Sequence, residues 1–161
     1  MVSSTLVALS LVLSQASPLA ALQPVGETRL KVLWFEVYNA RLYSHNGDYN
    51  GIQAPLALEL EYLRDIDADD LVEKTREEWQ RLGLYRADQS EPWLNRLSTL
   101  WPDVEKGDRL TLKLEPDHSA FYFNDQPLGR VDGGGFGLSF VAIWLHPEAR
   151  YPKLRSQLIG D

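Results

Sequence analysis

The sequence predicts an α+β fold, in which helices cover one side of a mainly antiparallel sheet. Three observations support this class. Segments that alternate apolar and polar residues, as half-buried strands do, occur near both ends of the chain. Two segments between them place apolar residues at helical spacing. The later strands follow one another through short turns, as in an antiparallel meander. The 161 residues contain neither a repeat nor a linker, so we expect one domain.

The first strand region covers residues 28–43, which read TRLKVLWFEVYNARLY and are rich in β-branched and aromatic side chains. This length accommodates one or two strands. Asn46-Gly47 then provides a turn. In residues 56–63, Leu and Tyr alternate with Ala, Glu and Leu, which predicts a half-buried strand.

Two helices are expected next. Asp67 is a suitable N-cap for the first helix, and Gly83 ends it. Ser90 is expected to cap the second helix, which Pro102 stops. The apolar stripes of the two helices are Leu71, Val72, Trp79 and Leu82, and Trp93, Leu94, Leu97 and Trp101.

The last third of the chain predicts three strands and a helix. The expected strands are residues 110–114, 120–123 and 127–131. Asp132 is a plausible cap for a helix that carries Phe136, Phe140 and Trp144 on one face and ends at Pro147. An amphipathic tail over residues 154–159 is expected to pack against the core.

The N-terminus resembles a signal peptide. Residues 6–13, LVALSLVL, form an apolar run too short to span a bilayer, and small residues that suit signal peptidase follow it. A buried helix is the alternative, but Pro18 interrupts the segment and the run is apolar on all faces. We therefore expect a signal peptide over residues 1–22, a folded domain over residues 23–161, and a periplasmic or secreted location.

Composition excludes several classes of function. The net charge of -7 disfavours binding to nucleic acid, because phosphate backbones repel an acidic protein. The chain has no cysteine, and none of its three histidines has a second ligand at zinc spacing, so no metal or other cofactor is expected. No stretch after the signal peptide is apolar enough for stable membrane insertion. The sequence identifies no protein partner.

Motifs for catalysis are weak, and no catalytic residue is predicted. Ser139 lacks the final glycine of a nucleophile elbow. The glycines at 133–135 could cradle an anion, but no Walker lysine follows them, and a turn between strand and helix is the better interpretation. The paired carboxylates of residues 65–70 are typical of helix caps and solvated faces.

A set of ordered stretches carries a family resemblance. They are GETR (26–29), EVYNARLY (36–43), YLRDI (62–66), PDVEKGD (102–108), FYFN (121–124), LG (128–129) and IWL (143–145). In this order and spacing they resemble the bacterial chalcone isomerase-like family, exported domains related in fold to plant chalcone isomerase. The resemblance implies an open-faced β-sandwich, with a large antiparallel sheet, a helical layer and a cleft between them.

The same resemblance implies that fold and activity can separate, because the superfamily includes isomerases, non-catalytic members and fatty-acid-binding members. The isomerases use a threonine a few residues before a Val-Tyr pair. Val37-Tyr38 matches that pair, which places Leu33 at the threonine position. Arg29 is the nearest counterpart of the arginine with which they polarise the substrate. Since leucine has no hydroxyl, chalcone cyclisation is not expected.

The favoured hypothesis is an exported, non-catalytic protein that binds a small amphipathic ligand such as a fatty acid in the cleft. Arg29, Tyr38 and Arg64 are the candidate ligand-binding residues, because cationic and phenolic groups can anchor a polar head in an apolar cleft. For Arg64 the alternative is an ion pair with a neighbouring acid. The alternative functions are an isomerase or lyase-like enzyme acting on an unsaturated carbonyl compound, and a structural partner of an envelope protein.

Overall fold

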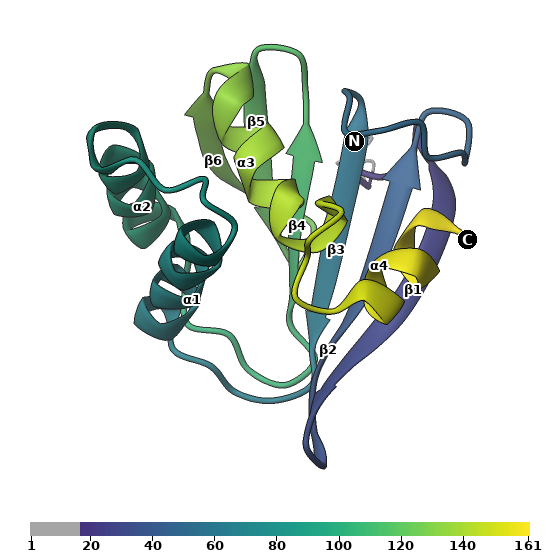
Figure 1. Ribbon diagram of the computed structural model, residues 1–161, viewed down its shortest axis with the longest axis horizontal. Helices are drawn as coiled ribbons and strands as arrows, with labels where there is room; N and C mark the ends of the chain where they lie inside the picture. Colours follow the sequence, from purple (N-terminus) through teal and green to yellow (C-terminus); the bar gives the residue numbers. More distant parts are fainter. Residues whose placement is uncertain (1–16) are drawn as a thin grey trace, which may run out of the picture.

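The computed structural model describes residues 17–161, which form a six-stranded antiparallel sheet and four helices (Figure 1). The apolar run of the predicted signal peptide lies outside the described residues. The strands are β1 (Gln23–Val32), β2 (Phe35–Ser44), β3 (Leu56–Tyr62), β4 (Arg109–Leu114), β5 (His118–Phe123) and β6 (Gln126–Asp132). The helices are α1 (Ala68–Arg81), α2 (Ala87–Leu100), α3 (Gly134–Leu145) and α4 (Pro152–Ile159).

The strands lie across the sheet in chain order, each antiparallel to the next. All four helices lie on one face: α4 packs on β1 and β2, α3 on β4 and β5, and α2 on β6 (Figure 1). The predicted α+β class and the order of the elements are therefore confirmed. Among residues 17–161, none of the helices has the length and apolar character that crossing a membrane requires.

The uncovered face of the sheet carries a network of ion pairs. Arg41 of β2 donates to Glu27 of β1 (Nε–Oε2, 2.9 Å) and to Glu59 of β3 (Nη1–Oε1, 3.1 Å). Arg109 of β4 pairs with Asp125 (Nη2–Oδ2, 3.1 Å). Opposite charges on neighbouring strands stabilise the pairing of those strands, and they keep this face of the sheet polar.

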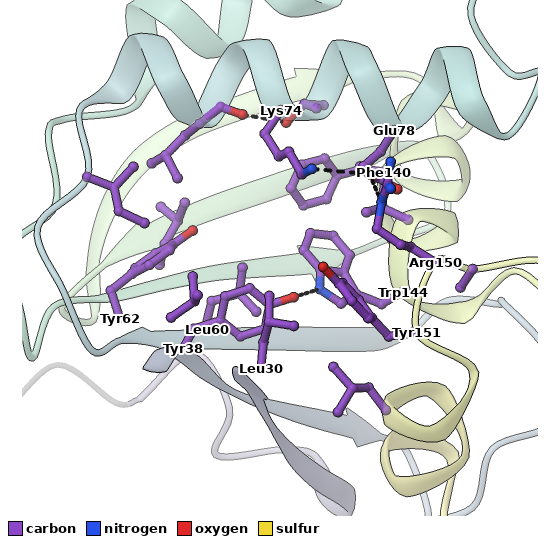
Figure 2. Close-up of a pocket in the computed structure, with 18 of the residues that line it drawn as sticks. Leu30, Tyr38, Leu60, Tyr62, Lys74, Glu78, Phe140, Trp144, Arg150 and Tyr151 are labelled. Carbon is purple, nitrogen blue, oxygen red and sulfur yellow. Dashed lines mark hydrogen bonds and ion pairs between the residues drawn. The ribbon is translucent and has the colours of Figure 1, made fainter. Parts of the chain in front are cut away.

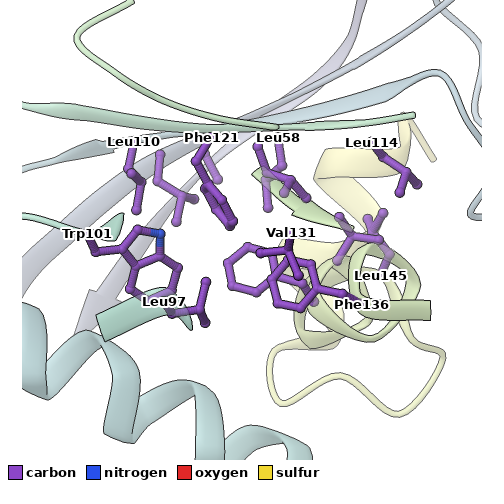
Figure 3. Close-up of a cluster of buried hydrophobic side chains, with 14 of the residues drawn as sticks. Leu58, Leu97, Trp101, Leu110, Leu114, Phe121, Val131, Phe136 and Leu145 are labelled. Carbon is purple, nitrogen blue, oxygen red and sulfur yellow. The ribbon is translucent and has the colours of Figure 1, made fainter. Parts of the chain in front are cut away.

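The core lies between the opposite face and the helices, and aromatic rings dominate it (Figure 3). Phe121 of β5 meets Trp101 and Phe136 edge to face, with ring centroids 5.5 and 6.0 Å apart. Trp79 of α1 is fully buried, and its Nε1 donates to the carbonyl of Ser139 at 2.8 Å. This bond ties α1 to α3, so the aromatic core holds the helical layer together.

The start of α2 differs from the prediction. Ser90 was expected to be the N-cap, but the helix begins at Ala87, with Arg86 as its N-cap. The hydroxyl of Ser90 instead accepts a hydrogen bond from the backbone N–H of Arg86 at 2.9 Å. Ser90 thus lies inside the helix and accepts from the backbone N–H of the N-cap residue. The last side chain of a capping box acts in the same way.

The other helix starts depend on tertiary contacts. Asp67 is the N-cap of α1 as predicted, but the N–H of Ala68 donates to Asp103 Oδ1 (2.8 Å), from a segment far along the chain. Asp132 does not cap α3, because β6 extends through it and Gly133 takes the N-cap position. The positive φ of Gly133 (88°) allows the chain to leave the strand there.

The tail packs against the core, as predicted, and the structure shows that it does so on β1. Leu158 of α4 is completely buried, and Gln157 accepts a hydrogen bond from the hydroxyl of Thr28. The contact requires glycine at position 26, because a Cβ there would lie 2.2 Å from the carbonyl oxygen of Gln157 and 2.6 Å from that of Leu158. Gly26 therefore sets how closely α4 approaches β1.

We predict that Gly26→Ala destabilises the protein by about 1–3 kcal/mol, because the new methyl group must displace backbone. Urea unfolding followed by circular dichroism measures the loss. Gly135→Ala is the matched control: its Cβ meets Trp93 at an ordinary 3.7 Å inside α3, so it should be neutral or slightly stabilising. Equal urea midpoints for the Gly26→Ala variant and the wild type would contradict the proposed contact.

Candidate functional site

A cavity of about 340 Å³ lies between the inner face of β1–β4 and helices α1, α3 and α4 (Figure 2). Its walls are mostly apolar, with Leu30, Leu60 and Leu110 from the sheet and Phe140 and Ile143 from α3. This volume is within the range of about 300–1,000 Å³ that small-molecule sites occupy. Protein interiors are otherwise packed with few voids larger than a water molecule, so the cavity marks the candidate site.

An ionised cluster borders the cavity where α1 faces the loop between α3 and α4 (Figure 2). The Glu78 side chain is only 4% exposed and accepts from Arg150 Nε at 2.6 Å and Arg81 Nε at 3.3 Å, with Lys74 Nζ at 3.5 Å. Burial by itself would raise the pKa of Glu78, but the hydrogen bonds from the two arginines and the charge of Lys74 lower it below its ordinary value. Glu78 is therefore ionised, and it fastens α1 to this loop.

The cavity also carries a cation whose charge is not neutralised. Arg155 of α4 lines it and donates from Nε to the carbonyl of Leu145 at 2.8 Å. It forms no ion pair with any residue in the range 17–161. Lys74, Arg150 and Arg155 are the lining cations, against the lining carboxylates Glu78 and Asp70. The charge that borders this apolar space is therefore cationic on balance.

Two tyrosines bring hydroxyl groups to the floor of the cavity. Tyr38 of β2 and Tyr62 of β3 are paired across the strands, with their rings edge to face at 6.2 Å. The hydroxyl of Tyr38 accepts from Trp144 Nε1 at 2.8 Å, which leaves its own proton free to donate (Figure 2). Burial raises the pKa of both tyrosines well above the ordinary value. Both groups therefore remain protonated donors.

Among the residues described, Trp101 has an unpaired polar atom next to the cavity. Its indole lines the cavity, and within the described part of the chain its buried Nε1 has no hydrogen-bond partner. It packs edge to face against Phe121 and Phe140, with centroids 5.5 and 5.8 Å away. Unpaired buried donors are rare and costly, and because the Nε1 atom is itself buried, it belongs to the core beside the cavity and is not presented to a ligand in the cavity.

The structure separates the three residues predicted from the sequence. Tyr38 lines the cavity. Arg29 does not: it lies on the uncovered face, where it donates to Glu36 (2.9 Å) and Asn39 (2.8 Å). The expectation that Arg29 anchors a ligand in the cleft therefore conflicts with its position, because neighbouring strand residues point to opposite faces and Leu30 takes the inward one.

Arg64 also lies outside the cavity lining. Its guanidinium stacks over the ring of Phe35, 5.3 Å from the centroid, in a cation–π contact. It forms no ion pair with the residues that the structure describes. The structure therefore shows a cation–π contact where the alternative interpretation expected an ion pair with a neighbouring acid. Leu33, at the position of the isomerase threonine, lies exposed in the turn between β1 and β2 and away from the cavity.

Sequence reasoning missed the charged residues at the cavity. Lys74 and Glu78 are four residues apart on α1. This spacing is typical of an ion pair on the surface of a helix, so it did not indicate a binding site. Arg150 and Arg155 lie in the last segment, and only the tertiary fold brings them to α1 and β2. A search for cations on the side of the tail that carries Leu158 would have found Arg155.

Comparisons with known proteins agree on the architecture. The family described as chalcone isomerase-like matches residues 15–160. An uncharacterized protein of Haemophilus influenzae is 31% identical over 145 residues, which cover 90% of this chain and 71% of that protein. The crystal structure of an Arabidopsis thaliana fatty-acid binding protein has a TM-score of 0.68 at 12% identity and covers 91% of each chain. At that identity the likeness concerns the fold, and it confirms the predicted open-faced arrangement.

We predict that Glu78 makes stability depend on pH. Because its pKa is lower in the folded state, the unfolded chain binds more protons, and the stability that Glu78 contributes is lost as the pH falls below the ordinary glutamate value of 4.5. Glu78→Gln should cost about 1–3 kcal/mol at pH 7 and should flatten the pH dependence of unfolding between pH about 5 and 3.

Chemical denaturation at a series of pH values measures this effect. Glu77→Gln is the control, because Glu77 is an exposed neighbour on the same helix and approaches only Lys74, at 3.9 Å. If the free energy of unfolding of the two variants depended on pH in the same way, the titration of Glu78 would not be the cause of the pH dependence.

Proposed function

The chain belongs to the chalcone isomerase-like family, and we propose that it is a non-catalytic protein that binds a small amphipathic anion, such as a fatty acid, in the cavity between sheet and helices. The observation that carries the proposal is the combination in one cavity of apolar walls with the cations Lys74, Arg150 and Arg155. An apolar chain gains free energy by leaving water for such walls, and an anionic head gains charge-assisted hydrogen bonds from guanidinium groups.

Among the three cations, Arg155 is the best anchor. Arg150 already donates to Glu78, and Lys74 is shared between Glu77 and Glu78. Arg155 donates its Nε to a backbone carbonyl and also lies within hydrogen-bond reach of the Tyr49 hydroxyl. No carboxylate in the described part of the chain pairs with it, so its guanidinium can still hold the carboxylate of a ligand. The Tyr38 hydroxyl offers a further donor to the same ligand.

Two further points favour binding over the alternatives. The position that matches the isomerase threonine, Leu33, is not among the residues that line the cavity and has no hydroxyl, so the residue pattern of those enzymes has no counterpart there. An open cavity also suits a binding protein better than a purely structural partner, for which a filled interior is expected. The similar Arabidopsis protein is by name a fatty-acid binding protein, which supports the chemical class of the proposed ligand.

We propose, in addition, that the protein acts after export. The support is the apolar run of residues 6–13 and the small residues that follow it. When the chain is expressed from Met1 in a Gram-negative host, the intact mass of the protein recovered from the periplasm should lack a segment that ends near residue 22. A chain that stays in the cytoplasm and retains that segment would contradict export.

We predict that Arg155→Ala weakens binding of laurate about tenfold or more, which is about 1.4 kcal/mol, because the variant loses charge-assisted hydrogen bonds to the carboxylate. Isothermal titration calorimetry with laurate, and with its methyl ester as the uncharged ligand, measures the effect. The wild type should prefer the acid, and this preference should disappear in the variant.

Lys153→Ala is the matched control, because Lys153 is an exposed cation on the same helix and is not among the residues that line the cavity. It should bind laurate as the wild type does. If the wild type binds neither ligand, or if both variants weaken binding equally, the cavity is not the anion site proposed here.

A further inference from the structure

The hairpin of β1 and β2 extends beyond the rest of the sheet (Figure 1). The register of β2 with β3 ends at the pair Tyr38–Tyr62, and one further bond joins Leu63 N to the Val37 carbonyl. β1 and β2 continue to pair past this point, to Val32–Phe35. The end of the hairpin therefore has no third strand beside it.

This overhang carries four consecutive apolar residues, Val32, Leu33, Trp34 and Phe35, here called the hairpin tip. Leu33 is 79% exposed and Trp34 80%, and the other two are about half exposed. Leu33 also has a positive φ of 57°, a conformation that turns usually reserve for glycine or asparagine. Small polar residues would adopt this turn with less strain and less exposed apolar surface. The apolar residues therefore indicate a contact outside the chain.

The dimensions of the hairpin tip favour a membrane surface over a protein partner. An aromatic residue buries about 150–250 Å² at most, so four partly exposed side chains offer on the order of 400 Å². A stable protein interface takes about 800 Å² from each partner. A narrow convex tip that contains a tryptophan instead suits the boundary between lipid headgroups and acyl chains, where tryptophan is enriched.

The residues behind the hairpin tip fit the same surface. Lys31, with its side chain 59% exposed, and Arg29 lie one and three residues before the tip, and Arg64 stacks on Phe35. Long cationic side chains at this depth can reach lipid phosphates while their stems stay apolar. Glu36 lies among them and pairs with Arg29 and Lys31.

We propose that the hairpin tip docks reversibly into the surface of a phospholipid bilayer, with Leu33 and Trp34 entering the interface. The lipid is zwitterionic, because the net charge of -7 repels an anionic surface. This contact is peripheral and requires no helix that spans the membrane. Val32 belongs both to the hairpin tip and to the cavity lining, so the docked tip places the cavity beside the lipid.

The first test uses the full chain and vesicles of phosphatidylcholine and phosphatidylethanolamine in equal parts, with bromine on the acyl chains. Bromine quenches only tryptophans that enter the lipid, and the chain has five tryptophans. The quenching should be lost in Trp34→Phe, which keeps an apolar tip and still binds. If Trp34→Phe is quenched as much as the wild type, Trp34 does not enter the bilayer and the proposal fails.

The second test measures flotation with the same vesicles without bromine. The double variant Leu33→Ser/Trp34→Ser should lower the partition coefficient roughly tenfold or more, because it removes two apolar side chains from the contact. Leu138→Ser is the control, since Leu138 is an exposed leucine on α3, and it should float as the wild type does. All variants carry the same N-terminus, so a difference in flotation between them reports the substituted side chains.

Gel filtration of the same proteins completes the test. Equal flotation of the double variant and the wild type would overturn the proposal. So would a wild type that does not float but dimerises through the hairpin tip. Neither outcome bears on laurate binding, which is measured without vesicles, so this proposal and the proposed cavity function can fail separately.

Discussion

The pleat of the sheet is the constraint on which the rest of the structure depends. Successive residues of a strand point to opposite faces, and in β1, β2 and β3 this alternation divides charge from apolar surface. Arg41 meets Glu27 and Glu59 on the uncovered face, whereas Leu30 and Leu60 turn toward the helices. The ion pairs allow that face to stay exposed to water without a covering layer. All four helices therefore pack on the other face, where they enclose both the core and the cavity.

The cavity persists because the helices around it are fixed by contacts that do not fill it. Glu78 accepts hydrogen bonds from Arg150 and so holds α1 to the loop after α3. The carbonyls of α4 sit against Gly26, which fixes the other wall. These contacts lie at the edge of the space, and the aromatic cluster around Phe121, whose members Trp101 and Phe140 also line the cavity, fills the neighbouring part of the interior. The interior beside the cavity is therefore closely packed and the elements around the cavity are fastened to one another, so the cavity itself can stay open.

Much of the fold could be predicted from the sequence, because strand alternation and helix periodicity are local properties. The site was harder. The family resemblance pointed to Arg29, yet the alternation within the same strand already separates Arg29 from Leu30, so the local pattern was the better guide to the face that Arg29 occupies. Arg155 gave only a weak local signal, its place on the Leu158 side of the tail, since its role depends on the docking of α4 on β1. The start of α2 was missed for a different reason, because the local bond from Arg86 N–H to the Ser90 hydroxyl places Ser90 inside the helix and not at its N-cap.

The hairpin tip and the cavity meet at Val32, and this continuity has a physical consequence for an amphipathic ligand. A molecule with a long apolar chain is sparingly soluble, so crossing water between a bilayer and the protein exposes its apolar surface, at about 25 cal/mol for each Å². A tip that reaches the acyl chains while its base lines the cavity shortens that exposed path. In the binding mode proposed above, the lining cations Lys74, Arg150 and Arg155 then hold the head group once the chain has entered. On these two proposals, the apolar turn, which adds nothing to the core, serves the exchange of ligand with a membrane.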